Sequence, residues 1–257
     1  MSTATRVAFI TGAAQGIGEA IALRLADDNI DVALFDLKEK EPLLKNVVKQ
    51  IEAKGRKAIY FVGDVTQEQD VKTSIDRTVE TLGGLDIMVA NAGITIFKPF
   101  VESDIEDYRR IMDINVLGVV NCFKYAAIQL IKQGRGGRII GACSGAGKRG
   151  INNMSLYSAS KFAVRGLTQA TSLELRSHKI TVNSYAPGFI LTPMLAHPDD
   201  DKFGGHGSVA KMAAKMDPDY EGAQPSVVAE LVAYLIKPEA HFVNGQVINI
   251  DGGLLFD

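Results

Sequence analysis

Tyr157 and Lys161 are the residues whose types and spacing most clearly suggest chemistry. They lie four positions apart in YSASKFAVRG, residues 157–166, which has the pattern of an amphipathic helix. Side chains four apart share one face of a helix, so the phenol and the ammonium would be neighbours. A phenol and an ammonium side by side raise the question of whether the pair has a chemical role. The alternative is an ordinary surface pair with Lys161 in water.

A glycine-rich turn near the N-terminus has the properties of a phosphate-binding loop. TGAAQGIG follows an apolar run, and a helix is expected to begin within it. Glycines allow a tight turn and let the backbone approach a pyrophosphate at a helix N-terminus. Their spacing differs from the G-x-G-x-x-G fingerprint, and a merely tight turn is the alternative. The residues expected to bind a dinucleotide here are Gly12, Gln15, Gly16, Ile17 and Gly18.

Asp36 ends the second apolar run, DVALFD. A carboxylate at that place can accept hydrogen bonds from an adenosine ribose 2′-hydroxyl, and it would repel a 2′-phosphate. The glycine turn carries no Arg or Lys to offset this charge, so NAD is favoured over NADP, although Lys38 lies close by. A helix-capping or turn carboxylate is the alternative role for Asp36.

Polar and small residues follow the other apolar runs as well. Asp64 could meet the adenine amino group, with Val65 against the ring. Asn91 can tie neighbouring strand ends together, and Gly93 keeps the floor of the site open. Thr192 could hydrogen-bond a nicotinamide carboxamide. Ser144, Pro187 and Gly188 reach the same edge, where open α/β sheets bind cofactors.

Short β-type runs alternate with long helical patterns along the chain. The expected strands are residues 6–11, 31–36, 57–65, 85–93, 137–144, 180–188 and 246–253, and the expected helices are 16–28, 39–54, 67–83, 104–133, 155–178 and 225–237. The runs are almost continuously apolar, which is typical of strands covered on both faces. The pattern predicts one α/β domain over residues 1–257, a Rossmann-like doubly wound parallel sheet of about seven strands with helices on both faces.

Two features stand outside this pattern. Asn115 lies within an apolar stretch of the expected helix 104–133, and a buried Asn needs hydrogen-bond partners. It is either a local cap in a strained helix or part of a polar network.

Residues 194–224 form a long connection rich in Gly, Asp and Met, in which SVAKMAAKM could form a short helix. Such a connection is expected to be a lid over the site, and a surface loop without a role in binding is the alternative.

The composition disfavours several classes of protein. The 257 residues are 46% apolar and 23% charged, as in a soluble globular protein, and the net charge of −2 offers no basic surface for nucleic acid or an anionic membrane. No apolar run reaches the ~18–20 residues of a membrane helix, and no signal peptide is apparent. Two cysteines and four scattered histidines give no disulfide framework and no metal site. A cytoplasmic protein without a metal is expected.

TGAAQGIG, NAG, Ser144 and the Tyr157-x-x-x-Lys161 pair together resemble the short-chain dehydrogenase/reductase family over essentially the whole chain. IIGACSGAG, YSASKFAVRGLTQ, ITVNSYAPG and IDGGLLFD look like the acetoin reductases, which also act as diacetyl reductases and meso-2,3-butanediol dehydrogenases. The resemblance implies an NAD(H)-dependent oxidoreductase that interconverts a ketone and a secondary alcohol. It also implies a homotetramer, the usual assembly of the family.

The resemblance implies a role for each catalytic residue. Tyr157 would be the general acid in reduction and the base in oxidation, with its pKa of about 10 lowered by Lys161 and the nicotinamide ring. Ser144 would hydrogen-bond the substrate oxygen in the manner of an oxyanion donor. Lys161 would also hold the nicotinamide ribose, and Asn115 would hold a water that links Lys161 to solvent. Hydride transfer belongs to the cofactor.

The sequence departs from the acetoin-reductase pattern at three pocket positions. The pattern typically has Gln where this chain has Gly145, often Asn at Ile151, and commonly Trp at Leu195. All three changes remove polarity or bulk, so they predict a roomier and more apolar pocket. Acetoin is small and polar, and the loss of polar partners costs selectivity for it. We expect a bulkier hydrophobic ketone or secondary alcohol as substrate.

Two other functions are open at this point. An NADPH-dependent ketoreductase of a biosynthetic pathway is the alternative within the enzyme class. A catalytically silent dinucleotide-binding sensor would keep the glycine turn and Asp36, but it would need no Ser144, Tyr157 or Lys161. The expected partners are a small-molecule substrate and further copies of the chain, with no nucleic acid and no membrane.

Overall fold

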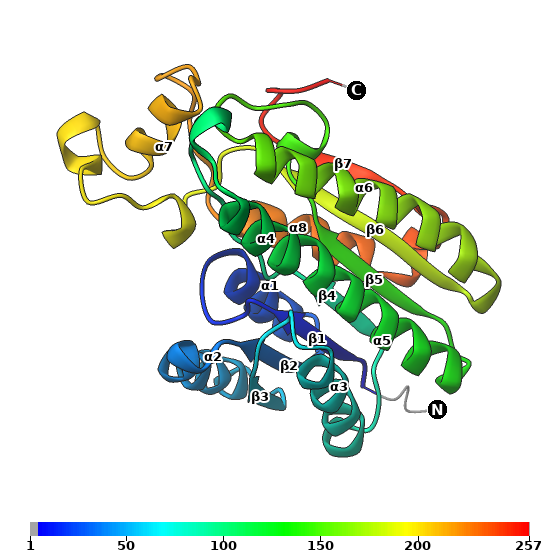
Figure 1. Ribbon diagram of the computed structural model, residues 1–257. Coiled ribbons are helices and arrows are strands. Elements are labelled where there is room, and N and C mark those ends of the chain that lie inside the picture. The colour runs from blue at the N-terminus through cyan, green and yellow to red at the C-terminus, as the bar shows by residue number, and fades with distance from the viewer. Residues whose placement is uncertain (1–4, 257) are drawn as a thin grey trace.

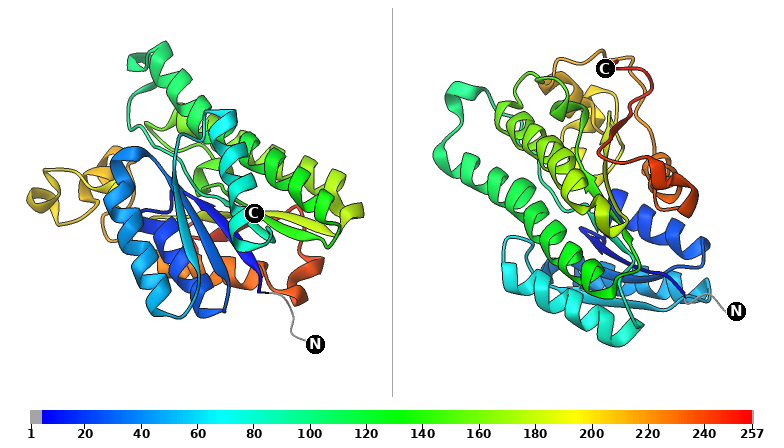
Figure 2. Two further views of the ribbon diagram at one scale, coloured as in Figure 1. Left: turned by 90° about the horizontal axis from the view of Figure 1, so that it is seen from below. Right: turned by 90° about the vertical axis from the view of Figure 1, so that its right-hand side faces the viewer.

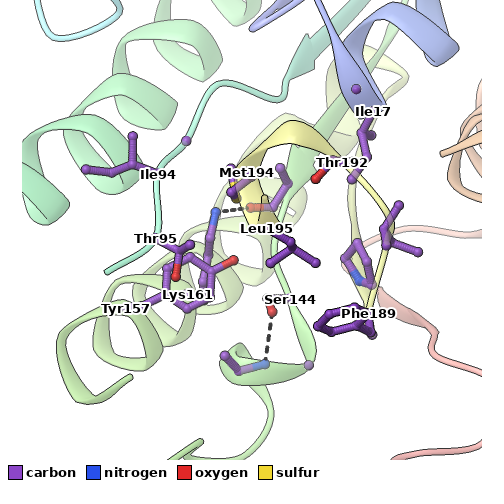
Figure 3. A pocket seen from close by; sticks show the side chains of 18 of the residues that line it. Ile17, Ile94, Thr95, Ser144, Tyr157, Lys161, Phe189, Thr192, Met194 and Leu195 are labelled. Atoms are coloured by element: carbon purple, nitrogen blue, oxygen red, sulfur yellow. Dashed lines mark hydrogen bonds between the residues drawn. The ribbon is translucent and has the colours of Figure 1, made fainter. Parts of the chain in front are cut away.

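Seven parallel strands form one twisted sheet at the centre of the molecule (Figure 1). The computed structural model describes residues 5–256. The strands are β1 (Val7–Thr11), β2 (Asp31–Asp36), β3 (Ala58–Val62), β4 (Ile87–Ala90), β5 (Gly137–Ala142), β6 (Ile180–Pro187) and β7 (Val247–Ile250). Their order is β3-β2-β1-β4-β5-β6-β7, so the chain reverses its direction of travel between β1 and β4. Ligands of such sheets bind at this switch point, beyond the carboxyl ends of the strands, and the cavity shown in Figure 3 lies there.

Helices cover both faces of the sheet, as Figure 2 shows. The helices are α1 (Gly16–Asp27), α2 (Glu41–Ala53), α3 (Glu68–Leu82), α4 (Ile105–Met112), α5 (Gly118–Gln133), α6 (Ser155–Leu175), α7 (Ser208–Ala213) and α8 (Ser226–Leu235). Residues of α1, α2 and α8 belong to the core on one face, and residues of α3, α5 and α6 belong to the core on the other. The predicted doubly wound α/β fold is confirmed.

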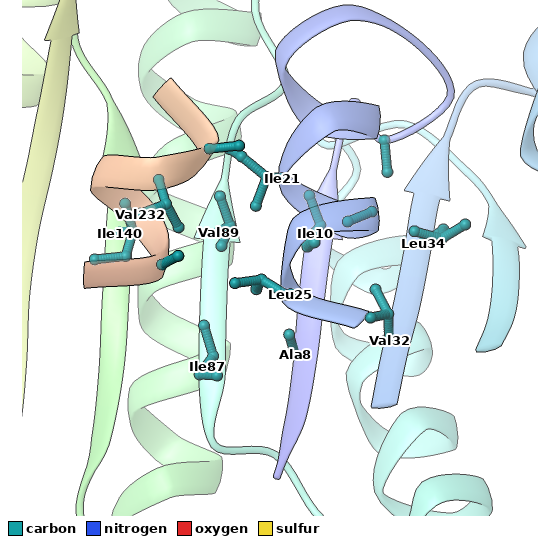
Figure 4. Close-up of a cluster of buried hydrophobic side chains, with 14 of the residues drawn as sticks. Ala8, Ile10, Ile21, Leu25, Val32, Leu34, Ile87, Val89, Ile140 and Val232 are labelled. Atoms are coloured by element: carbon teal, nitrogen blue, oxygen red, sulfur yellow. The ribbon is translucent and has the colours of Figure 1, made fainter. Parts of the chain in front are cut away.

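Strand register explains why the runs are apolar at every position. Ile10 of β1 lies opposite Leu34 of β2 and Val89 of β4, and all three point into the core under α1 (Figure 4). Neighbouring Phe9 and Met88 point to the opposite face, because successive side chains of a strand alternate. Both faces are covered by helices, so both sets of side chains are apolar.

The structure corrects the expected boundaries of several elements. The helix expected at 104–133 contains a π-helical turn, Asp113–Leu117, between α4 and α5. Strands β3, β4 and β7 each end three residues before their expected ends, because the residues that follow them form loops. The last expected turn of α6 is a separate 3₁₀ turn, Arg176–His178.

One helical stretch contradicts the expectation that no segment could cross a membrane. Ile105–Gln133 has the length and apolar composition of a membrane span, and half of its most apolar window is buried inside the fold. Val119, Phe123, Ala126 and Leu130 of this stretch pack in the core beside β4 and β5. This stretch therefore packs as a core helix does.

Residues 194–224 project from the body of the molecule (Figure 1), and several of them, including Met194 and Met216, line the cavity. The segment contains a 3₁₀ turn at Asp200–Phe203 and helix α7, which confirms the helix expected in SVAKMAAKM. Buried Asp200 accepts backbone hydrogen bonds from His197 (2.9 Å), Gly207 (2.8 Å) and Val209 (3.1 Å). These bonds, led by the one from Gly207, lower the pKa of Asp200 to about 2, so the carboxylate is charged across the physiological pH range.

Candidate active site

A cavity of about 250 Å³ opens at the carboxyl ends of β1, β4, β5 and β6. Most residues predicted from the sequence line it, and they are Gly12, Gln15, Gly16, Ile17, Asp36, Asn91, Gly93, Ser144, Gly145, Ile151, Tyr157, Lys161, Pro187, Gly188, Thr192 and Leu195. Gly18, Asp64, Val65 and Asn115 do not line it. Asp36 and Lys161 are the charged residues among those that line the cavity.

The glycine-rich turn has the geometry that close approach of a phosphate requires. Gly12 and Gly16 adopt left-handed conformations, with φ of +62° and +64°, which other residues rarely adopt. A Cβ atom at Gly18 would lie 2.1 Å from the carbonyl oxygen of Gly12, so only glycine lets α1 approach the turn. Gln15 precedes α1 without a side-chain cap, so the first N–H groups of that helix can bind an anion.

Asp36 is held at the end of β2 by the backbone. Its Oδ2 accepts a hydrogen bond from the N–H of Ala14 (3.0 Å), and its Oδ1 accepts one from Leu37 (2.8 Å). Lys38 forms an ion pair with Glu41. Lys40, which the sequence analysis did not single out, donates to Oε1 of Gln15 over 3.3 Å. A lysine therefore contacts the glycine turn, although the turn itself contains none.

Asn91 joins three strands, as predicted. Its Nδ2 donates to the carbonyl oxygens of Thr11 (2.9 Å) and Gly12 (3.0 Å), which connects β4 to β1 and the glycine turn. Its Oδ1 accepts a hydrogen bond of 2.8 Å from the hydroxyl of Tyr185 on β6. Tyr185 is fully buried, and burial raises its pKa, so it remains a neutral donor. Sequence reasoning missed Tyr185, because its partner lies 94 residues away.

Asp64 and Val65 lie outside the cavity. Asp64 Oδ1 accepts a hydrogen bond of 2.9 Å from Thr66, which closes the turn after β3. Val65 is buried and contacts Gly118, where a Cβ atom would lie 2.7 Å from its Cγ2. The structure gives both residues a structural role, and their expected contacts with adenine stay a prediction.

Tyr157, Lys161 and Ser144 face one another across the cavity (Figure 3). Lys161 Nζ lies 5.4 Å from the ring centre of Tyr157 and donates a hydrogen bond of 2.9 Å to the carbonyl oxygen of Ala142. Ser144 follows β5, and its Oγ accepts a hydrogen bond of 3.1 Å from the N–H of Ala146. That contact uses a lone pair of the oxygen, so the hydroxyl proton of Ser144 is left for a hydrogen bond with Tyr157 or with a bound substrate.

Burial governs the protonation of this pair in the protein chain. It raises the pKa of Tyr157 to about 12, against the opposing effect of a hydrogen bond with Ser144. Burial also lowers the pKa of Lys161 to about 8. Desolvation disfavours both charged forms and sets the direction of both shifts in the chain alone. The lowering of the Tyr157 pKa expected from Lys161 together with a bound nicotinamide ring stays a prediction. At neutral pH both residues hold their protons.

Asn115 belongs to a polar network, as one of the two sequence interpretations proposed. Its Oδ1 accepts from the N–H of Ile94 (2.9 Å), and its Nδ2 donates to the Ile94 carbonyl (2.9 Å) and to Ser160 Oγ (3.1 Å). Ser160 in turn donates to the carbonyl oxygen of Tyr157 (2.7 Å). Both amide hydrogens are thus engaged with protein groups. The observed contacts position the loop after β4 against α6, and the water expected at Asn115 stays a prediction.

Apolar side chains surround the rest of the cavity. They include Ile94, Phe97, Ile151, Phe189, Leu195, Met216, Leu254 and Leu255. The extra room expected at Gly145 is absent, because Leu255 Cδ1 lies 2.9 Å from where a Cβ atom of Gly145 would be. The sequence analysis missed this contact between residues far apart in the chain.

Comparison with known proteins gives matches over the whole chain. The sequence model described as short chain dehydrogenase matches residues 6–202. A short-chain dehydrogenase/reductase of Armillaria gallica is 48% identical over 98% of this chain and 97% of its own length. The L-2,3-butanediol dehydrogenase of Corynebacterium glutamicum is 38% identical over 98% of this chain and its full length. Carveol dehydrogenase of Mycobacterium avium, solved in complex with NAD, superposes with a TM-score of 0.88 at 28% identity, covering 98% of both chains.

Proposed function

This chain belongs to the short-chain dehydrogenase family, and from that premise we propose that it is an NAD(H)-dependent oxidoreductase interconverting a neutral, apolar ketone and its secondary alcohol. The observation that carries the proposal is the convergence of Tyr157, Lys161 and Ser144 on one cavity with the glycine turn and Asp36. A non-catalytic sensor would have no use for the first three residues.

The proton chemistry follows from the protonation of the site. In reduction, Tyr157 donates its proton to the carbonyl oxygen, and the Ser144 hydroxyl donates a hydrogen bond to the same oxygen and stabilises its developing charge. Lys161 is cationic below pH about 8 and lies next to the phenol, so its charge stabilises the phenolate left behind. Asn115 and Ser160 hold the backbone of Tyr157 in place. The nicotinamide, when bound, supplies the hydride in reduction and accepts it in oxidation.

The chain fits a dinucleotide. The left-handed glycines and the uncapped N-terminus of α1 would hold the pyrophosphate, and Asp36 would accept hydrogen bonds from the adenosine ribose. Thr192, Pro187 and Gly188 also line the cavity, and they would surround the nicotinamide. One relative supports the choice of NAD, since carveol dehydrogenase was solved with it. Another supports the proposed reaction, since L-2,3-butanediol dehydrogenase is named for a secondary alcohol.

Cofactor choice is tested by Asp36→Ala. A hydrogen bond to a charged group contributes about 1.5–3 kcal/mol, so kcat/KM for NADH should fall about tenfold to a hundredfold. Activity with NADPH should rise, because Lys40 lies beside the turn and the repelling carboxylate is gone. Exposed Glu39 provides the control, Glu39→Ala. A wild-type enzyme that turns over NADPH faster than NADH would support the alternative, a biosynthetic NADPH-dependent ketoreductase.

Substrate class is tested by comparing kcat/KM for acetoin, diacetyl and a series of cyclic and aromatic ketones. Lys161 is the cation among the residues that line the cavity, and it is proposed to act beside the proton donor Tyr157, whereas Asp36 is proposed to bind the cofactor. The lining residues therefore offer no further cation to a carboxylate or phosphate on the substrate. The cluster of apolar side chains favours ketones with hydrocarbon substituents. A clear preference for acetoin would contradict this proposal.

We also propose a cytoplasmic homotetramer. Both cysteines are free and buried, as in proteins of a reducing compartment. Large apolar side chains are exposed on the outer helices, including Ile128 of α5 and Phe162 and Leu173 of α6, and a partner subunit would cover them. Light scattering of the purified protein would detect the tetramer, and a monomer would contradict it.

A further inference from the structure

The C-terminal residues after β7 form a wall of the cavity. Gly252 and Gly253, with φ of +61° and +85°, reverse the chain direction directly after the strand. The reversal brings Leu254 and Leu255 to the cavity, and Leu255 is only 9% exposed. Its Cδ1 lies 2.9 Å from the Cβ position of Gly145, next to Ser144. A side chain from the end of the sequence thus occupies space beside the residue proposed to bind the substrate oxygen.

This C-terminal loop, residues 251–255, is held in place by a buried carboxylate. Asp251 is 7% exposed, and its two oxygens accept hydrogen bonds of 3.0 Å from the N–H groups of Gly253 and Leu255. Asn249 Nδ2 on β7 donates to the carbonyl oxygen of Leu255 over 3.2 Å. Both the N–H and the carbonyl oxygen of Leu255 are therefore hydrogen-bonded, which fixes the point from which its side chain starts.

The same loop contacts the segment 194–224. The hydroxyl of Tyr220, in that segment, donates to the carbonyl oxygen of Asp251. Gly188, after β6, leaves room for this contact, since its Cβ atom would lie 2.8 Å from both the Tyr220 hydroxyl oxygen and Asp251 Cβ. The C-terminal loop and the proposed lid therefore meet at the edge of the cavity and are positioned together.

We propose that Leu255, positioned by Asp251, is a specificity-determining residue of the substrate pocket. It packs against the hydrocarbon substituent on the carbonyl carbon and selects ketones with a branched or cyclic apolar group over hydroxyketones and diketones. A second polar group on the substrate would lie against Leu255 without a hydrogen-bond partner, which is costly in a buried site. The proposal rests on the proposed function and adds the residue that selects the substrate.

The first test is Leu255→Asn, assayed as the ratio of kcat/KM for an apolar cyclic ketone to that for acetoin, with NADH. Polar contacts in such pockets change discrimination strongly, so the ratio should fall at least about tenfold. Phe256→Ala is the matched control, because Phe256 is the next residue and is 90% exposed. It should keep the wild-type ratio.

A double-mutant cycle tests the contact itself. Gly145→Leu should collide with Leu255 and lower kcat/KM for the cyclic ketone about tenfold or more, whereas Gly145→Leu with Leu255→Ala should recover most of it. Asp251→Asn replaces one accepting oxygen by an amide donor and should raise KM for the ketone severalfold with little change in kcat. That split distinguishes a positioning role from a general loss of folding.

The outcomes separate this proposal from the proposed function. A wild-type protein that reduces no ketone with NADH overturns the function and this proposal with it. An active wild-type enzyme whose Leu255→Asn variant keeps the wild-type ratio, and whose Gly145→Leu and Leu255→Ala effects simply add, overturns the role of Leu255 alone. Thermal melting identifies any variant that does not fold. If Leu255→Asn does not fold, the same ratio of kcat/KM is measured for Leu255→Val and for Leu255→Met, which keeps the bulk but adds a polarizable sulfur.

Discussion

Removing one buried hydroxyl should disturb the cofactor site from a distance. Tyr185→Phe keeps the ring in the core but removes the donor to Asn91 Oδ1, a hydrogen bond of 2.8 Å. The amide of Asn91 holds the carbonyl oxygens of Thr11 and Gly12. Loss of its third contact should loosen the glycine turn, although Tyr185 itself lies on the other half of the sheet.

The size of the effect follows from the burial of the two partners. An acceptor left unpaired in the interior costs about 1–3 kcal/mol. Asn91 lines the cavity, where water can reach it, so we expect about 1–2 kcal/mol. For a chain of this length that lowers Tm by about 2–8 °C. A loss of about 1 kcal/mol in the order of the turn corresponds to a roughly fivefold rise in Kd for NADH.

Thermal melting and NADH fluorescence titration measure the two quantities. Tyr234→Phe is the control, because Tyr234 on α8 is 49% exposed, and it should leave both unchanged. If Tyr185→Phe melts at the wild-type temperature and binds NADH normally, the hydrogen bond to Asn91 does not organise the turn. A lower Tm with unchanged NADH affinity would confine the role of Tyr185 to stability.

Three further outcomes are expected. Tyr157→Phe removes the proton donor and should lower kcat for ketone reduction about 10²–10⁴-fold. Tyr108→Phe, which changes an exposed tyrosine, is the control and should keep the wild-type kcat. Near-normal turnover in Tyr157→Phe would refute the acid role. Burial lowers the pKa of Lys161 to about 8 and raises that of Tyr157 to about 12. The rate of ketone reduction should therefore decline as the pH rises through about 8, because Lys161 loses its charge. A pH–rate profile that is flat to pH 10 would contradict this. Asp200→Ala should raise KM for the ketone severalfold, because it removes hydrogen bonds that hold the backbone of the segment 194–224. Asp201→Ala, at an exposed neighbouring residue, is the control. Equal KM values in the two variants would show that the segment is no lid.

Local pattern was enough to predict the elements and most of the residues that line the cavity. The apolar runs predicted all seven strands, and the glycines at 12, 16 and 18 marked the turn before α1. These predictions succeed because strand and helix periodicity, and the conformational freedom of glycine, act over a few residues. Strand ends were predicted less well, since polar residues that continue a run can belong to the loop, as at Asp64.

Contacts between distant residues were not predictable from one sequence. Neither Tyr185 nor Asn91 indicates the other, because the pairing depends on β1 lying between β2 and β4 and on the order of β4 to β6. The direction of the pKa shift of Tyr157 also needed the fold. The spacing of Tyr157 and Lys161 shows that they are neighbours, but only the fold shows the burial that disfavours the charged form of each.

The sequence by itself determined that this protein is a parallel α/β fold with a glycine turn, an acidic residue at the end of the second strand and a tyrosine–lysine pair on one helix face. Each of these depends on residue types a few positions apart. The tertiary structure alone decided that Leu255 fills the space beside Gly145, that Asn115 joins Ile94 to Ser160, and that the C-terminal loop meets the segment 194–224 at Tyr220. Substrate choice depends on such contacts, because the pocket is formed by loops that only the packing of the whole sheet brings together.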